Sequence, residues 1–101
     1  MTQDQGPIVD LPVVHNAEAR HFEMTVDGQR AFAAYRSRDG TIVLTHTEVP
    51  LALEGRGIGG ALARAALEYA RDAGLAVVPL CPFMARYTRH PQYQPLIRTS
   101  L

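Results

Sequence analysis

The segment LEGRGIGGAL, residues 53–62, decides the fold, because its glycines separate two stretches of different periodicity. Gly55, Gly57 and Gly60 make a literal G-x-G-x-x-G, a spacing found in loops that hold phosphate groups at the start of a helix. A glycine-rich turn that only allows a strand and a helix to pack closely has the same spacing. The spacing alone therefore leaves a ligand-binding loop and a structural turn open.

Downstream of the loop, apolar residues recur at helical spacing from Gly57 to Ala73. The central stripe comprises Ile58, Ala61, Leu62, Ala65 and Tyr69, and it is widened by Ala63, Leu67 and Ala70. Gly74 is well placed to end this helix in a left-handed cap. The continuous apolar run LAVVPL, residues 75–80, is typical of a strand that is buried on both faces.

Upstream of the loop, strand-like segments alternate with turn signals. Asp27-Gly28 and Asp39-Gly40 are two-residue hairpin signals between the segments 20–26, 29–36 and 41–49. These segments predict an antiparallel meander.

Two details of the meander can be predicted further. The segment 8–15 is interrupted by Pro12, which suits an edge strand. Side chains alternate along a strand, so one face of the segment 41–49 is expected to carry Ile42, Leu44, His46 and Glu48.

The order of elements predicts an α+β fold. A strand–helix–strand crossover places its two strands parallel and adjacent in a sheet that is otherwise antiparallel. A short helix is expected over 83–90 after Pro82, followed by a helical turn within 91–97. With 101 residues, the chain suits one domain over 10–101, preceded by a flexible leader over 1–9.

Composition excludes several classes of protein. Apolar content of 47% and charged content of 20% are ordinary for a globular protein. Neither a membrane-length apolar run nor a signal peptide is present, so we expect a cytoplasmic protein that does not associate with membranes. A single cysteine, Cys81, excludes an internal disulfide, and the four histidines are too scattered to predict a metal site. The chain has no lysine and no dense basic stripe, which argues against a nucleic-acid partner.

Charge is balanced overall but unevenly placed. Residues 1–55 contain eight acidic residues and four arginines, for a net charge of −4, whereas residues 56–101 contain six arginines and two acidic residues, for +4. Positive charge beside a glycine loop suits an anionic ligand, although charge alone favours a dipolar surface without a ligand.

Two familiar nucleotide-binding motifs are ruled out. A dinucleotide-binding fold needs an acidic residue about 20 positions after the loop, and the corresponding segment VVPLCPF has none. A Walker A loop needs a lysine, which this chain lacks. The remaining possibility is a diphosphate held by backbone amides at a helix N-terminus.

Four segments together resemble the minimal GNAT-type N-acetyltransferases: THTEVP, EGRGIGGALARAALEYAR, GLAVVPLCPF and RHPQY. The resemblance covers residues 12–98 and implies a GNAT-like mixed sheet that binds acetyl-CoA where two parallel strands part. It implies that backbone of Thr47, Glu48 and Val49 pairs with the pantetheine arm. It also implies that the diphosphate lies on the loop formed by Gly55, Arg56, Gly57, Ile58, Gly59 and Gly60. Glu54 stands where the wider superfamily has Gln or Arg, so we expect its side chain to turn away.

The resemblance also places three candidate catalytic residues in the active site: His46, Cys81 and Tyr87. His46 suits a general base, because an imidazole accepts a proton near neutral pH. Tyr87 aligns with the tyrosine that protonates departing CoA, although an aromatic that only packs the short helix fits as well. Cys81 is either a nucleophile, which would require pairing with His46, or a residue that lines the thioester pocket.

The expected activity is direct transfer of an acetyl group from acetyl-CoA to an amine, on a protein or a small molecule. The alternative is a non-catalytic acyl-CoA-binding or interaction module. The sequence names neither the amine acceptor nor the oligomeric state.

Overall fold

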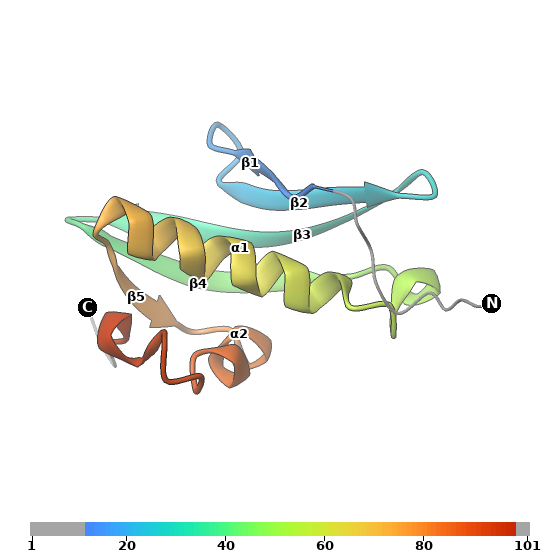
Figure 1. Ribbon diagram of the computed structural model, residues 1–101. Coiled ribbons are helices and arrows are strands. Elements are labelled where there is room, and N and C mark those ends of the chain that lie inside the picture. The colour runs from blue at the N-terminus through green and yellow to red at the C-terminus, as the bar shows by residue number, and fades with distance from the viewer. Residues whose placement is uncertain (1–11, 99–101) are drawn as a thin grey trace.

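The structure is a computed structural model that describes residues 12–98. Its order of elements is shown in Figure 1: β1 (Val14–Asn16), β2 (His21–Val26), β3 (Gln29–Arg38), β4 (Thr41–Glu48), η1 (Leu51–Leu53), α1 (Ile58–Ala73), β5 (Ala76–Pro79), α2 (Pro82–Tyr87) and η2 (Gln94–Leu96). The leader predicted over 1–9 and the start of the first predicted strand lie outside the described residues.

The five strands form one sheet in the order β1-β2-β3-β4-β5. Every neighbouring pair is antiparallel except β4 and β5, which run parallel from Thr41 opposite Ala76 to Leu44 opposite Pro79. The meander, the edge position of the first strand and the parallel crossover are thus confirmed. The fold is α+β, as the sequence predicts.

Both predicted hairpin turns are present. Asp27 and Gly28 have φ values of 52° and 77°, and Asp39 and Gly40 have φ values of 45° and 77°. Positive φ at both central residues is the signature of a type I′ turn, whose twist matches that of the flanking strands. These turns fix the register of β2 on β3 and of β3 on β4.

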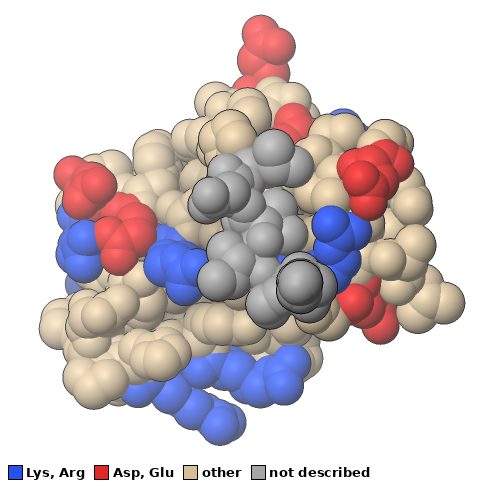
Figure 2. Space-filling model, turned by 45° about the vertical axis from the view of Figure 1, so that its right-hand side comes forward, with Lys and Arg blue, Asp and Glu red and all other residues tan. Residues whose placement is uncertain are grey.

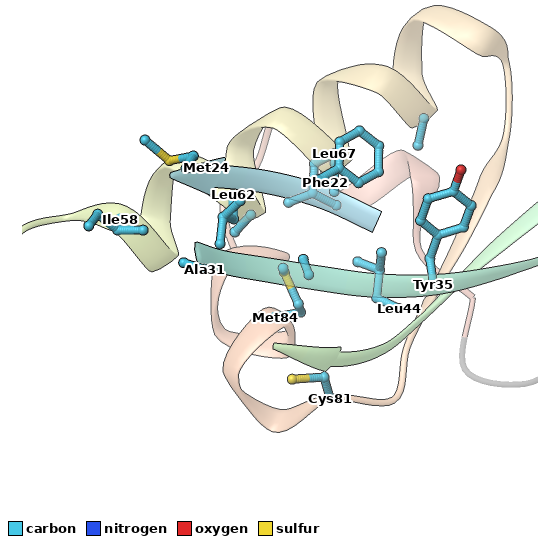
Figure 3. Packing of buried hydrophobic residues seen from close by; sticks show 14 of the residues in the cluster. Phe22, Met24, Ala31, Tyr35, Leu44, Ile58, Leu62, Leu67, Cys81 and Met84 are labelled. Atoms are coloured by element: carbon cyan, nitrogen blue, oxygen red, sulfur yellow. The ribbon is translucent and has the colours of Figure 1, made fainter. Parts of the chain in front are cut away.

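The helix α1 lies across one face of the sheet, over β2 and β3 (Figure 1). It begins after Gly57 and ends at Gly74, both in the left-handed conformation that favours glycine. Figure 3 shows Leu62 and Leu67 beside Phe22 and Met24 of β2. Burial of a leucine side chain contributes about 1.5–3 kcal/mol, so this interface holds α1 and the residues before it in place.

Short elements depart in detail from the predicted boundaries. The turn η1 was not expected. It begins directly after Pro50 and buries Leu53. The helix predicted over 83–90 begins at Pro82 and ends at Tyr87, and just beyond its end the Thr88 hydroxyl donates a hydrogen bond back to the Ala85 carbonyl. The expected last helical turn is present as η2, and Ile97 then forms a single parallel bridge with Val77.

Candidate active site

The strands β4 and β5 part at one residue, Leu44. Its carbonyl oxygen accepts hydrogen bonds from the amides of both Leu80 and Cys81, at 3.0 and 3.1 Å, where the chain leaves the sheet. β4 continues to Glu48 and remains paired with β3 on its other side. Within residues 12–98, the edge of β4 from Thr45 to Glu48 that would face β5 has no strand partner, so its backbone groups can bind a ligand.

A β-bulge in β4 changes which side chains face this opening. Ala34 lies opposite His46 and Tyr35 opposite Leu44, so Thr45 has no cross-strand partner, and its hydroxyl donates to the Ala34 carbonyl. The extra residue reverses the alternation of faces. The expectation that Leu44 and His46 share a face is therefore wrong.

The same register sets the faces of the residues after the bulge. Thr47 lies opposite Ala33, which is fully buried beneath α1, whereas His46 and Glu48 lie opposite Ala34 and Phe32 on the other face. Residues 45–48 form the free half of β4. This half presents the Thr47 hydroxyl toward α1 and the ionisable side chains of His46 and Glu48 away from α1.

A cavity of about 500 Å³ adjoins the unpaired edge. Its size is typical of small-molecule sites. It is lined by His46, Thr47, Glu48 and Val49 of the β4 end, Leu53 and Glu54, the glycine loop residues Gly55, Gly57, Ile58, Gly59 and Gly60, and Phe83 and Tyr87 of α2. The structure therefore brings most of the predicted site residues together, with Arg56 and Cys81 as the exceptions.

The N-terminus of α1 opens on this cavity without a side-chain cap. Its N-cap residue is Gly57, with φ 78°, and no side chain of the described residues caps it. The amides of Ile58, Gly59 and Gly60 have no partner within the helix, since the first intrahelical bond runs from the Ala61 amide to the Gly57 carbonyl, at 3.0 Å. Uncapped amides beside a cavity are suited to an anion.

Gly59 and Gly60 also let α2 approach α1 closely. A Cβ at Gly59 would collide with the Phe83 ring, and one at Gly60 would lie 3.1 Å from the Tyr87 hydroxyl. Phe83 and Tyr87 are four residues apart on α2, with ring centroids separated by 5.3 Å. The glycines thus position the Tyr87 hydroxyl against the start of α1.

The side chain of Arg56 is directed to the β2–β3 hairpin. Its Nη1 donates to Oδ2 of Asp27 at 3.0 Å, and the ion pair ties the glycine loop to the turn. Glu54 is exposed and lies among the residues that line the cavity.

His46 is open to solvent at the mouth of the cavity. Its imidazole Nε2 lies 3.9 Å from Oε2 of Glu48, and both side chains are about 60% exposed. Its ring lies edge-on to Phe32, at 6.0 Å between centroids. An exposed imidazole with a neighbouring carboxylate can accept a proton from a substrate that arrives from solvent.

Cys81 is buried, and its nearest polar partner is Thr47. The Cys81 Sγ lies 3.5 Å from the Thr47 hydroxyl, and no hydrogen bond joins Cys81 to His46. Burial raises the pKa of the Cys81 thiol, but the Thr47 hydrogen bond and the backbone amides of Met84 and Phe83 outweigh burial, so the net pKa is lowered.

Comparisons with known proteins agree with this geometry. Residues 21–96 match the family model described as GCN5-related N-acetyl-transferase. The chain belongs to this family. It is 37% identical over 94 residues to Protein NATD1 of Mus musculus, covering 87% of this chain and 83% of that protein. Against Protein NATD1 of Homo sapiens it is 37% identical over 89 residues, covering 82% of this chain and 79% of that protein.

The fold is that of a solved relative. The solution NMR structure of a GCN5-like protein from Staphylococcus aureus superposes with a TM-score of 0.68 at 26% identity, over 91% of this chain and 92% of that one. The predicted resemblance to GNAT-type N-acetyltransferases and the predicted GNAT-like fold are therefore confirmed.

Sequence analysis missed two side chains that line the cavity, Leu53 and Phe83. Leu53 carried no signal in the sequence beyond its apolar side chain. Phe83 had a signal, because it lies four residues before Tyr87, a spacing that places two side chains on one face of a helix.

Within residues 12–98, no helix is both long enough and apolar enough to cross a membrane. The same residues contain no group of three His, Cys, Asp or Glu side chains placed to hold a metal ion.

Proposed function

We propose that this chain is an N-acetyltransferase that takes an acetyl group from acetyl-CoA and passes it directly to an amine. The observation that carries the proposal is the free half of β4, which borders the same cavity as the uncapped amides of α1. Free backbone groups along one wall suit the two amides of a pantetheine arm, and the helix amides suit a diphosphate.

Under this proposal, Thr47, Glu48 and Val49 bind the arm mainly through their backbone. The amides of the loop from Gly55 to Gly60 bind the diphosphate. Glycine at the N-cap supports this assignment, because it leaves the first-turn donors free and puts no Cβ in the path of the oxygens.

The donor supplies an acetyl thioester, and the chain's side chains handle the protons. The amine nitrogen attacks the carbonyl carbon and loses a proton to His46, whose exposed side chain lines the cavity mouth. The carbon–sulfur bond breaks, and the sulfur leaves with the bonding electrons. Tyr87 donates its phenolic proton to that sulfur and is reprotonated from solvent.

Direct transfer is supported over an acetyl-cysteine intermediate by the positions of the two candidate residues. A covalent route needs a base beside the thiol, whereas Cys81 contacts Thr47 and His46 contacts Glu48. We therefore assign Cys81 to the wall behind Thr47. Intact-mass spectrometry after incubation with acetyl-CoA tests this assignment: no acetyl adduct is expected, and stoichiometric acetylation of Cys81 would overturn it.

Calorimetry with CoA and acetyl-CoA, followed by a thiol-release assay, tests the whole proposal. The assay uses a lysine peptide, a peptide with a free N-terminus and a small primary amine. We expect binding of both cofactors and thiol release with at least one amine. Binding without release from any amine would favour the non-catalytic acyl-CoA-binding module, and absence of binding would exclude both.

A further inference from the structure

Two glutamates line the main cavity, Glu48 from the end of β4 and Glu54 from the residue after η1. Both side chains are exposed. Among the described residues that line the cavity, none is an arginine, and the chain contains no lysine. We call Glu48 and Glu54 the cavity glutamates.

The arginines of the neighbouring elements are engaged by other carboxylates. Arg30 of β3 pairs with Glu23 at 3.1 Å, and Arg56 of the glycine loop pairs with Asp27 at 3.0 Å. Among the described residues, no arginine forms an ion pair with either cavity glutamate. The cavity therefore presents two carboxylates whose charge no arginine side chain neutralises.

These two carboxylates do not suit the acetyl donor. Coenzyme A is negatively charged through its phosphates, and the proposed function places its diphosphate on the amides of α1, in the same cavity. Carboxylates in that cavity oppose the binding of an anion, because like charges repel. A cation on the second substrate would offset this repulsion, so the charge of the cavity points to the acceptor.

Glu48 lies where the acceptor nitrogen has to arrive. Under the proposed function His46 takes a proton from that nitrogen, and Oε2 of Glu48 lies 3.9 Å from Nε2 of His46. Both side chains project from the face of β4 that is turned away from α1. An alkyl ammonium that reaches His46 is thus within reach of Glu48, and Glu54, on the loop side of the cavity, is available to a second positive charge.

The rest of the surface directs a cation to the β4 side of the cavity. α2 and the segment after it carry Arg86, Arg89 and Arg98 and no acidic residue. In Figure 2, blue side chains gather along the lower edge of the molecule, the level at which α2 lies in Figure 1. This edge repels a cationic acceptor, which is therefore favoured to approach over the exposed end of β4.

We propose that the cavity glutamates select an acceptor that carries a second positive charge besides its reactive amine. The inference rests on the proposed function, since it concerns the acceptor of that reaction. Glu48 binds the reactive group as an ammonium, and Glu54 binds the second cation. The ammonium releases one proton to solvent before the neutral amine attacks the thioester, and His46 accepts the next proton. A lysine in a basic peptide and a small diamine both have this chemistry, whereas an amine that carries its own carboxylate is disfavoured.

Thiol-release kinetics with three acceptors that share one lysine amine tests the inference on the full chain. Nα-acetyl-lysine carries a carboxylate, its amide carries no further charge, and Nα-acetyl-arginyl-lysine amide carries a second cation. We expect kcat/KM to rise in that order, by roughly two- to fivefold at each step, as an exposed ion pair allows. The steps should shrink at high salt, because salt screens exposed charges. Putrescine, compared with the dipeptide, shows whether a small diamine or a basic peptide is the better acceptor.

Two variants and a matched control locate the preference. Glu54→Gln should bring the ratio of kcat/KM for the dipeptide and the lysine amide close to one. Glu48→Gln should raise the KM for the lysine amide severalfold. Glu18→Gln makes the same change at an exposed glutamate that does not line the cavity, so it should leave both quantities unchanged.

The possible failures are distinguishable. Equal kcat/KM for the three acceptors in the wild type would overturn this inference and leave the proposed function standing. A preference for the dipeptide that survives in both Glu48→Gln and Glu54→Gln would also overturn it, because the charge would then be recognised elsewhere. If no amine released the thiol, the proposed function would fail and this inference with it.

Discussion

Along β4, Thr41–Leu44 lie between two strands, whereas residues 45–48 have a strand on one side only. In the first half Ile42, Val43 and Leu44 are almost completely buried, and in the second half His46 and Glu48 are exposed. One extra residue, Thr45, separates the two halves. The comparison shows that a single strand can serve the core and the site, provided that its pairing with β5 ends and its register with β3 shifts at the same point.

The largest expected effect falls on activity in the free half. His46→Gln should lower kcat/KM by roughly 10²–10⁴-fold, the usual contribution of a general base, and should change the free energy of unfolding by less than about 0.5 kcal/mol, because the side chain is exposed. Steady-state kinetics and denaturant unfolding measure both quantities. Retention of full activity would remove His46 from the mechanism.

The next largest effect falls on stability in the paired half. Leu44→Ala removes a side chain that is 1% exposed and should cost about 2–5 kcal/mol of unfolding free energy. Glu48→Ala, in the free half, is the matched control and should stay within about 0.5 kcal/mol. If the two variants were equally stable in urea unfolding, the contrast between the halves would be wrong.

A smaller effect is expected at the loop that faces the free half. Arg56→Glu should raise the KM for acetyl-CoA roughly tenfold, about 1.4 kcal/mol of binding, by placing a negative charge beside the diphosphate and breaking the ion pair with Asp27. Asp27→Asn separates these causes. An increased KM in Asp27→Asn means that the ion pair holds the loop, and an unchanged KM means that the charge of Arg56 acts on the ligand. An unchanged KM in Arg56→Glu would exclude a role for this residue.

The smallest effect concerns Cys81, which lies where the halves meet. The Thr47 hydroxyl favours the thiolate, so Thr47→Val should raise the pKa of the Cys81 thiol, and the thiolate should form at higher pH than in the wild type. Ultraviolet absorbance of the single thiolate during a pH titration measures the shift. A lower or unchanged midpoint would show that the contact does not stabilise the thiolate.

Local signals explain why much of the fold was predictable. The Asp-Gly pairs at 27–28 and 39–40 dictate type I′ turns, and the helix from Ile58 to Ala73 has a glycine at each end. The parallel pairing of β4 with β5 follows from the crossover itself.

The bulge could not be predicted, because Thr45, His46 and Thr47 continue a regular alternation and only the pairing with β3 reveals the extra residue. For the same reason the sequence could not show that His46 and Cys81 lie apart. The contact of Phe83 with Gly59 could not be predicted either, because it joins α2 to the start of α1, two segments distant in the sequence.

The contact of Phe83 and Tyr87 with two glycines limits how the pocket can be re-engineered for longer acyl chains. A side chain added at Gly59 or Gly60 would displace the ring of Phe83 or Tyr87, so α1 can supply no further lining residue without moving α2. Under the proposed function, room for a propionyl or butyryl group would have to come from a smaller residue at Phe83, Val49 or Leu53, which line the same cavity.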